Sequence, residues 1–219
     1  MNNIDIVTLV IIGANVLFSY KGFSDGTLFN TYKFQIGAIK KGEYIRMLSS
    51  GFLHADGSHL FFNMFTLYFF APVVTQILGT PAFIAIYFIG LFGGNALSYL
   101  YHKDNDYYSA IGASGAVSAV LFSSILLIPD QTLWLFAVIP IKAYVFGVGY
   151  LAYTVFGMKK QLGNIGHSAH LGGAITGLII TILIAPSLLQ TEYKLIIGMA
   201  IPILVFLLFG NKLTDKLTK

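Results

Sequence analysis

The sequence predicts an all-α polytopic membrane protein, with a core of six membrane-spanning helices and a seventh helix near the C-terminus. Of the 219 residues, 56% are hydrophobic and 10% are charged, and the mean hydropathy is +0.77. A typical soluble domain has about 25% charged residues. The apolar residues also fall into runs close to the roughly 20 residues that a helix needs to cross a membrane. These observations exclude an ordinary soluble domain.

Seven apolar runs are the candidates for these helices. They are residues 4–20, 59–78, 82–101, 109–128, 133–157, 168–189 and 194–210. The last run is short and has Pro202 near its middle, so we expect a helix that is tilted, kinked or only partly inserted. No repeat, linker or change of composition marks a second domain. We therefore expect one transmembrane domain over residues 1–219, with its core at about 4–189.

Cysteine content and charge narrow the possible functions. The chain has no cysteine, which excludes disulfides, thiolate metal sites and cysteine nucleophiles. Its net charge is +4, but the 13 Lys and Arg residues are scattered between the apolar runs and form no basic stripe. This distribution argues against a nucleic-acid partner. Several of these residues lie among aromatic residues at about 21–58, where we expect an interfacial loop.

A serine and a histidine inside apolar runs carry the strongest functional signal. Ser114 lies in Gly112-Ala113-Ser114-Gly115, and His170 follows in a later run. Ionisable residues in membrane segments are energetically costly and usually functional. A serine nucleophile needs a base within hydrogen-bonding reach and usually a third group that orients the base. All nine acidic residues lie at helix ends, in connections or in the tail, so we expect a Ser-His dyad without a carboxylate.

Alternating spans would place Ser114 and His170 at similar depth near one face of the membrane. Small residues allow membrane helices to approach closely. Gly112 and Gly115 on one helix, and Gly173 and Gly177 on the other, are therefore predicted to pack the two helices together at the site.

A third motif, His59-x-x-x-Asn63, places an imidazole and a carboxamide on one face of a helix. Both side chains can donate hydrogen bonds to a developing oxyanion. With the backbone N–H of Ser114 they would form an oxyanion hole, in which a single donor is typically worth about 2.7–4 kcal/mol.

Together these motifs resemble the signatures of the rhomboid intramembrane serine proteases. The likeness covers about residues 40–180 and includes Gly42-Glu43-Tyr44-Ile45-Arg46 and Ile139-Pro140-Ile141-Lys142-Ala143-Tyr144. It implies a rhomboid-like six-helix core and a serine endopeptidase that cuts peptide bonds in or beside transmembrane segments of other proteins. It also implies Ser114 as nucleophile, His170 as general base and then acid, and oxyanion stabilisation by His59, Asn63 and the Ser114 amide. No cofactor and no metal are implied.

Two features depart from the family's usual pattern, Ser118 and the Tyr44-Ile45 that replaces the tryptophan-rich part of the loop motif, and the distribution of charge conflicts with the family's orientation. Four residues after the nucleophile, where many members carry an aromatic that stacks on the catalytic imidazole, this chain has Ser118. The positive-inside rule would also place the face with the first loop, Lys103, Lys159 and Lys160 in the cytoplasm. The resemblance implies the opposite orientation, and we follow it. We expect a protein of the plasma (inner) membrane whose active site faces the extracytoplasmic side.

Three alternatives remain open at this stage. A lone serine between small residues is more often a packing residue than a nucleophile. His167-x-x-His170 could form a metal-binding pair, and with His59 could serve a haem-binding protein or a transporter. A non-catalytic protein of the same fold could bind membrane helices without cutting them. The resemblance implies transmembrane protein substrates, and we expect membrane lipid as a further partner; the sequence does not indicate an oligomeric state.

Overall fold

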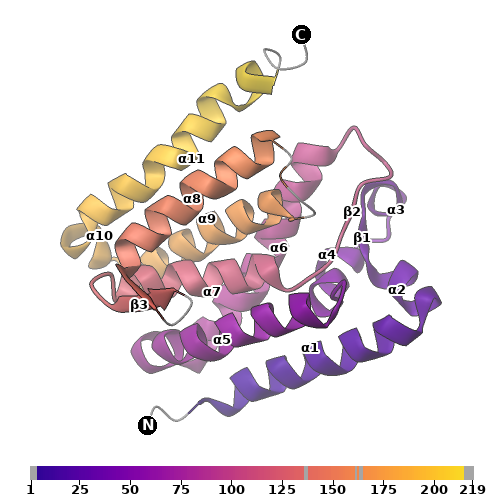
Figure 1. Cartoon of the computed structure of the whole chain (residues 1–219), viewed down its shortest axis with the longest axis horizontal. Helices are drawn as coiled ribbons and strands as arrows, with labels where there is room; N and C mark the ends of the chain where they lie inside the picture. Colours follow the sequence, from indigo (N-terminus) through magenta and orange to yellow (C-terminus); the bar gives the residue numbers. More distant parts are fainter. Residues whose placement is uncertain (1–3, 136–137, 161, 163–164, 215–219) are drawn as a thin grey trace.

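The computed structural model describes residues 4–135, 138–160, 162 and 165–214, and these form a bundle of long helices (Figure 1). The long helices are α1 (Ile6–Ser24), α5 (Gly57–Leu78), α6 (Thr80–His102), α7 (Ser114–Leu127), α8 (Ala143–Lys160), α9 (His167–Ile184) and α11 (Tyr193–Thr214). Within the described residues, α1, α5, α6 and α9 are long and apolar enough to cross a membrane. The predicted fold class, an all-α polytopic membrane protein, is confirmed.

Helix α7 lies in the middle of the bundle, between α5 and the α6–α9 pair (Figure 1). Its residues 115–126 are all buried. The hydroxyls of Ser123 and Ser124 donate to backbone carbonyls four residues back, at 2.7 and 2.9 Å, so these polar groups are satisfied inside an apolar core. A helix of 14 residues is about 21 Å long, shorter than the roughly 30 Å hydrocarbon layer. At least one end of α7 therefore lies within the membrane.

Glycines bring the backbones of α6, α7 and α9 into direct contact. Gly173 lies against the backbone of Gly115, and Gly177, one turn later, lies against the backbone of Ala119. A Cβ atom on Gly94 of α6 would stand 2.7 Å from the carbonyl oxygen of Ala169. Lipid provides no hydrophobic drive for helices to associate, so van der Waals contact at small residues holds them together.

The first connection, predicted as an interfacial loop, is a folded subdomain. It contains α2 (Gly26–Tyr32), β1 (Phe34–Gln35), α3 (Ile36–Lys40), α4 (Arg46–Ser49) and the 3-10 helix η1 (Ser50–Phe52). Its own core consists of Phe34, Ile36, Ile39 and Met47. The buried guanidinium of Arg46 donates to the carbonyls of Asn30 and Lys33 at 2.7 and 2.9 Å and pairs with Glu43 at 2.7 Å.

The first connection is also tied to the segment that precedes α7. Strand β1 pairs in antiparallel fashion with β2 (Ser109–Ala110), with Phe34 opposite Ala110. The first connection therefore reaches the residues that lead into Ser114.

Two predicted helix boundaries are wrong. The run 109–128 begins with strand β2 and a turn, and its helix starts only at Ser114. The run 133–157 begins with a hairpin of β3 (Thr132–Leu135) and β4 (Ile139–Lys142). A continuous apolar run does not distinguish a strand from a buried helix. Pro140, which lacks an N–H and is restricted in φ, favours a strand end or turn over a helix interior.

The seventh helix, α11, follows the short helix α10 (Leu188–Thr191) and packs on α8 at one edge of the bundle (Figure 1). Met199 of α11 is 1% exposed. Its methyl carbon fills the space at Gly147 of α8, where an added Cβ would lie 2.9 Å away. Helix α8 is thereby held between α9 on one side and α11 on the other.

The glycine contacts predict a steep cost for one added methyl group. Gly177→Ala places a Cβ against the backbone of Ala119, which cannot give way as a side chain could. Overpacking of this kind typically costs about 1–3 kcal/mol. We expect a lower midpoint of thermal unfolding in detergent micelles.

The matched control is Gly13→Ala in α1, where an added Cβ has no neighbour within 4 Å. We expect this variant to unfold at or slightly above the wild-type temperature, because alanine is the better helix former. Equal midpoints for the two variants would contradict close backbone contact between α7 and α9.

Candidate active site

Ser114 is the first residue of α7, preceded by Ala113 as the N-cap residue. The first backbone N–H groups of a helix have no partner within the helix and attract anions. Within the described residues, no hydrogen bond occupies the Ser114 amide. The predicted helix 109–128 would have placed Ser114 more than one turn after its start, whereas α7 begins at Ser114. Its actual position leaves both its hydroxyl and its amide at the helix N-terminus.

The turn before Ser114 is held by the first connection. The N–H of Gly112 donates to the carbonyl of Ser50 at 3.0 Å, and the N–H of Ala113 donates to Nε2 of His54 at 3.3 Å. Gly112 has a φ of 116°, which residues with a Cβ rarely adopt. The prediction that Gly112 packs α7 against α9 is wrong, because Gly112 lies in this turn and contacts His59 instead.

His59 lies on the other side of this turn, near the start of α5. Its Nδ1 accepts the N–H of Ala55 at 3.4 Å, so the neutral imidazole carries its proton on Nε2. That atom would stand 2.8 Å from a Cβ on Gly112. The N–H of His59 itself is capped by Asp56 at 2.8 Å. His59 therefore presents an N–H donor to the residues just before Ser114.

Asn63 lies one helical turn after His59 on α5. One proton of its Nδ2 is donated to the carbonyl of His59 at 2.9 Å, which fixes the orientation of the carboxamide. The other proton is used by no hydrogen bond within the part of the chain that the structure describes. The two predicted oxyanion donors thus share one face of one helix.

His170 is the fourth residue of α9, and its N–H donates to the carbonyl of Gly166 at 3.1 Å. Gly173, three residues after His170, contacts the backbone of Gly115. This contact holds the turn of α9 that carries His170 against the first turn of α7, where Ser114 lies. Within the described residues, no hydrogen bond joins the Ser114 hydroxyl to His170. Catalytic hydrogen bonds are often long without substrate and shorten in the complex.

Tyr150 of α8 is a partner of His170 that the sequence analysis missed. Its hydroxyl lies 2.9 Å from Nδ1 of His170, and the two rings are stacked, with centroids 6.2 Å apart and an interplanar angle of 19°. Ser118 of α7 is 4% exposed, and its side chain lies beside the same hydroxyl. The serine in place of an aromatic at position 118 was the one signal in the sequence that the imidazole needed another partner.

His54 is fully buried between α1 and the turn before Ser114. Its Nδ1 donates to Ser19 Oγ at 2.8 Å, and its ring lies 4.9 Å from that of His59 between centroids. Burial is the larger cause and the nearby His59 the smaller one of a shift that lowers the pKa of His54 to about 3. His54 is therefore neutral, which leaves Nε2 free to accept the N–H of Ala113.

His167 and His170, the pair considered for metal binding, hydrogen-bond to different partners. His167 Nε2 lies 3.1 Å from the carbonyl oxygen of Leu162, to which it donates, and its ring centroid lies 6.3 Å from that of His170. In the described ranges, no group of three or more His, Cys, Asp or Glu side chains is placed to hold a metal.

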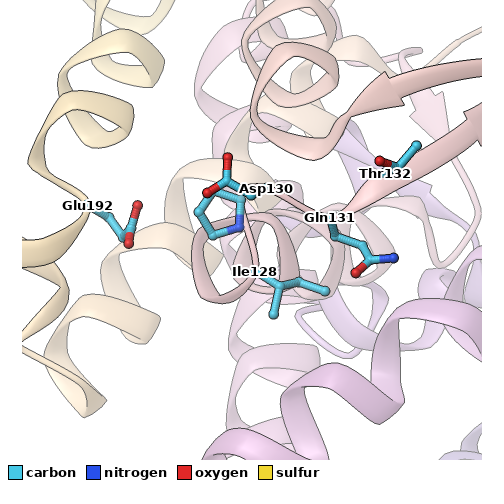
Figure 2. A pocket seen from close by; sticks show the side chains of 6 residues that line it. Ile128, Asp130, Gln131, Thr132 and Glu192 are labelled. Atoms are coloured by element: carbon cyan, nitrogen blue, oxygen red, sulfur yellow. The ribbon is translucent and has the colours of Figure 1, made fainter.

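A pocket of about 490 Å³ opens at the opposite end of α7 from Ser114 (Figure 2). It is lined by Ile128, Pro129, Asp130, Gln131, Thr132 and Glu192. Asp130 follows α7 and Glu192 precedes α11, so the two carboxylates come from distant segments. The length of α7 separates this pocket from the candidate active site.

The model of the Rhomboid domain family matches residues 41–187, which include Ser114, His170, His59 and Asn63. The chain belongs to the rhomboid family. It is 29% identical over 189 residues to RHOMBOID-like protein 12, mitochondrial, of Arabidopsis thaliana, covering 80% of this chain and 56% of that protein. It is 32% identical over 138 residues to human Presenilin-associated rhomboid-like protein, mitochondrial, covering 60% and 36%.

A third relative of this rhomboid is Rhomboid protein 1, mitochondrial, of Saccharomyces cerevisiae. The two are 30% identical over 139 residues, which cover 62% of this chain and 40% of the yeast protein. The chain thus spans between 36% and 56% of the length of these three relatives.

The low pKa of His54 predicts an acid-sensitive fold. An unfolded histidine titrates near pH 6.5, whereas His54 in the folded protein titrates near 3. Between these values the unfolded chain binds more protons. The contribution of His54 is therefore complete above pH 6.5 and is lost as the pH falls toward 3, by at most about 1.4 kcal/mol per pH unit.

We expect the free energy of unfolding, measured by denaturant titration in micelles, to fall less steeply over this range in His54→Asn than in the wild type. Asparagine keeps a polar side chain but does not titrate. Identical pH slopes for both proteins would show that His54 is not the titrating group.

Proposed function

We propose that this rhomboid is an intramembrane serine endopeptidase that hydrolyses peptide bonds in or beside transmembrane segments of other proteins. The observation that carries the proposal is the position of Ser114 at the N-terminus of the buried helix α7. There, the contact of Gly115 with Gly173 joins the first turn of α7 to the turn of α9 that carries His170. Ser114 and His170 act as a catalytic dyad, and no cofactor takes part in this mechanism.

In the acylation step, Nε2 of His170 removes the proton of Ser114 Oγ as this oxygen attacks the carbonyl carbon of the scissile bond. The negative charge that develops on the carbonyl oxygen is stabilised by the Ser114 N–H, Nε2–H of His59 and the second Nδ2 proton of Asn63. His170 then gives its proton to the leaving amine, the C–N bond breaks, and the acyl-enzyme remains.

In deacylation, His170 removes a proton from water, which attacks the acyl carbonyl. The tetrahedral intermediate collapses, Ser114 takes its proton back, and the new carboxyl product leaves. The oxyanion donors act on both tetrahedral intermediates. They are backbone or side-chain groups fixed before the reaction, so little reorganisation is needed as charge develops.

The substrate is a membrane-spanning segment of another protein. A helix in lipid satisfies its backbone hydrogen bonds internally, so its carbonyls are not open to attack until it unwinds locally. Segments with small or helix-breaking residues near the cut meet this need at least cost. A second candidate function, a rhomboid that binds membrane helices without cutting them, would require the same fold but not the alignment of Ser114 and His170.

For the location, we propose a plasma (inner) membrane with the Ser114 end of α7 on the extracytoplasmic side. The curated relatives are named mitochondrial proteins, so the membrane of this chain is itself part of the proposal. Many basic residues of the Ser114 end, among them Lys33, Lys40 and Lys41, lie in the folded first connection. A folded segment of this size weakens the positive-inside rule.

The catalytic proposal predicts the behaviour of four variants. We expect Ser114→Ala and His170→Ala to abolish cleavage of co-expressed single-span substrates and labelling by a fluorophosphonate probe. His59→Ala and Asn63→Ala each remove one oxyanion donor, so we expect cleavage to fall by roughly 10²- to 10³-fold. Cleavage and labelling are measured on gels.

The control is Ser58→Ala, whose exposed hydroxyl bonds only to Asp56 and should leave cleavage unchanged. Wild-type cleavage by Ser114→Ala would end the protease proposal. Folded protein that never cleaves any substrate would instead favour the helix-binding alternative.

The orientation is testable because the chain has no cysteine of its own. Tyr107 is 89% exposed near the Ser114 end and Val138 is 72% exposed at the opposite end, so each can carry a single cysteine. With expression in a bacterial inner membrane, an impermeant maleimide added to intact spheroplasts should label Tyr107→Cys and spare Val138→Cys until lysis. The reverse pattern would place the Ser114 end in the cytoplasm.

A further inference from the structure

We infer that Tyr150 of α8, supported by Ser118 of α7, is the positioning residue that holds the imidazole of His170 in its reactive tautomer. This inference rests on the proposed function, because it gives His170 the role of general base. It assigns to a residue of α8 the orienting task that a carboxylate performs in a Ser-His-Asp triad.

A general base must offer a lone pair on Nε2, so the single proton of neutral His170 must reside on Nδ1. In a Ser-His-Asp triad a carboxylate accepts the Nδ1 proton and selects this tautomer. Here the atom 2.9 Å from Nδ1 is the hydroxyl oxygen of Tyr150. A phenol can either donate or accept, so the tautomer depends on where the phenol's own proton goes.

Ser118 offers an acceptor for that proton. It is 4% exposed, and its side chain lies beside the Tyr150 hydroxyl. If Tyr150 donates to Ser118 Oγ, its oxygen lone pairs are left to accept the Nδ1 proton of His170. If Tyr150 donated to Nδ1 instead, the imidazole proton would sit on Nε2 and His170 could not act as a base. Donation from Tyr150 to Ser118 is therefore the arrangement that the positioning role requires and that the double-mutant cycle examines.

Ring packing fixes the phenol in place. Tyr150 lies between Phe146 of α8, at 5.7 Å and 25°, and Phe122 of α7, at 5.9 Å and 44°. Its hydroxyl lies 2.9 Å from Nδ1 of His170 and the two rings are nearly parallel, at an interplanar angle of 19°, which orients the imidazole. An aromatic side chain at position 118 would fill the space beside the Tyr150 hydroxyl. The small side chain of Ser118 is therefore needed for Tyr150 to reach His170.

The placement of Tyr150 also gives α11 a part in the site. Gly147 lies one turn before Tyr150 on α8, and the side chain of Met199 of α11 packs into the space beside it. The seventh helix thus steadies the segment of α8 that holds the imidazole.

The test uses a fluorescent fluorophosphonate as the probe on purified full-length protein in proteoliposomes, with KI and kinact measured separately. We expect Tyr150→Phe, which keeps the ring and removes the hydroxyl, to lower kinact about tenfold with KI unchanged. That is the size of one lost hydrogen bond. The matched control is Tyr144→Phe on the same helix, whose side chain is 41% exposed, and we expect wild-type kinetics.

A double-mutant cycle separates positioning from packing. Ser118→Ala alone should lower kinact about threefold, and should have no further effect in a Tyr150→Phe background, because Ser118 acts through Tyr150. The positioning role would be overturned if the two substitutions lowered kinact by the product of their separate effects, or if Tyr150→Phe kept the wild-type kinact. It would also be overturned if Tyr150→Phe changed KI or the melting temperature instead of kinact. Labelling of Ser114→Ala at the wild-type rate would instead end the proposed function itself.

Discussion

The structure depends on the direct backbone contact between α7 and α9. Gly173 and Gly177 lie against the backbones of Gly115 and Ala119, with no side chain in between. In lipid such contacts replace the hydrophobic drive that packs soluble helices. They also set the distance between the turns that carry Ser114 and His170. Stability and the geometry of the candidate active site therefore come from the same few glycines.

The polar groups of the site are satisfied almost entirely by neutral partners. Backbone carbonyls, hydroxyls and uncharged imidazoles form the hydrogen bonds around Ser114, and burial keeps His54 uncharged. A charge in this environment would carry a large desolvation cost. A phenol next to His170 avoids the cost of burying a carboxylate. It stabilises a protonated imidazole less than a carboxylate would, so the oxyanion donors have a correspondingly larger share in the proposed mechanism.

The first connection is part of the site rather than a cover over it. Ser50 and His54 hold the turn before Ser114, and the N-cap Asp56 begins the helix that carries His59 and Asn63. The buried Arg46 ties the connection together from within. These contacts explain how a turn with a positive φ at Gly112 stays in one conformation.

The sequence by itself determined the fold class and the family, because the length and spacing of apolar runs and three ordered motifs are local properties of the chain. It also placed the chemistry on Ser114, His170, His59 and Asn63, whose roles stay predictions. It did not determine where α7 starts or that residues 132–135 and 139–142 pair as two strands, since apolar runs do not distinguish helix from strand. Only the tertiary structure decided the true role of Gly112 and the pairing of Tyr150 with His170. Both depend on contacts between segments far apart in the sequence, which no local pattern records.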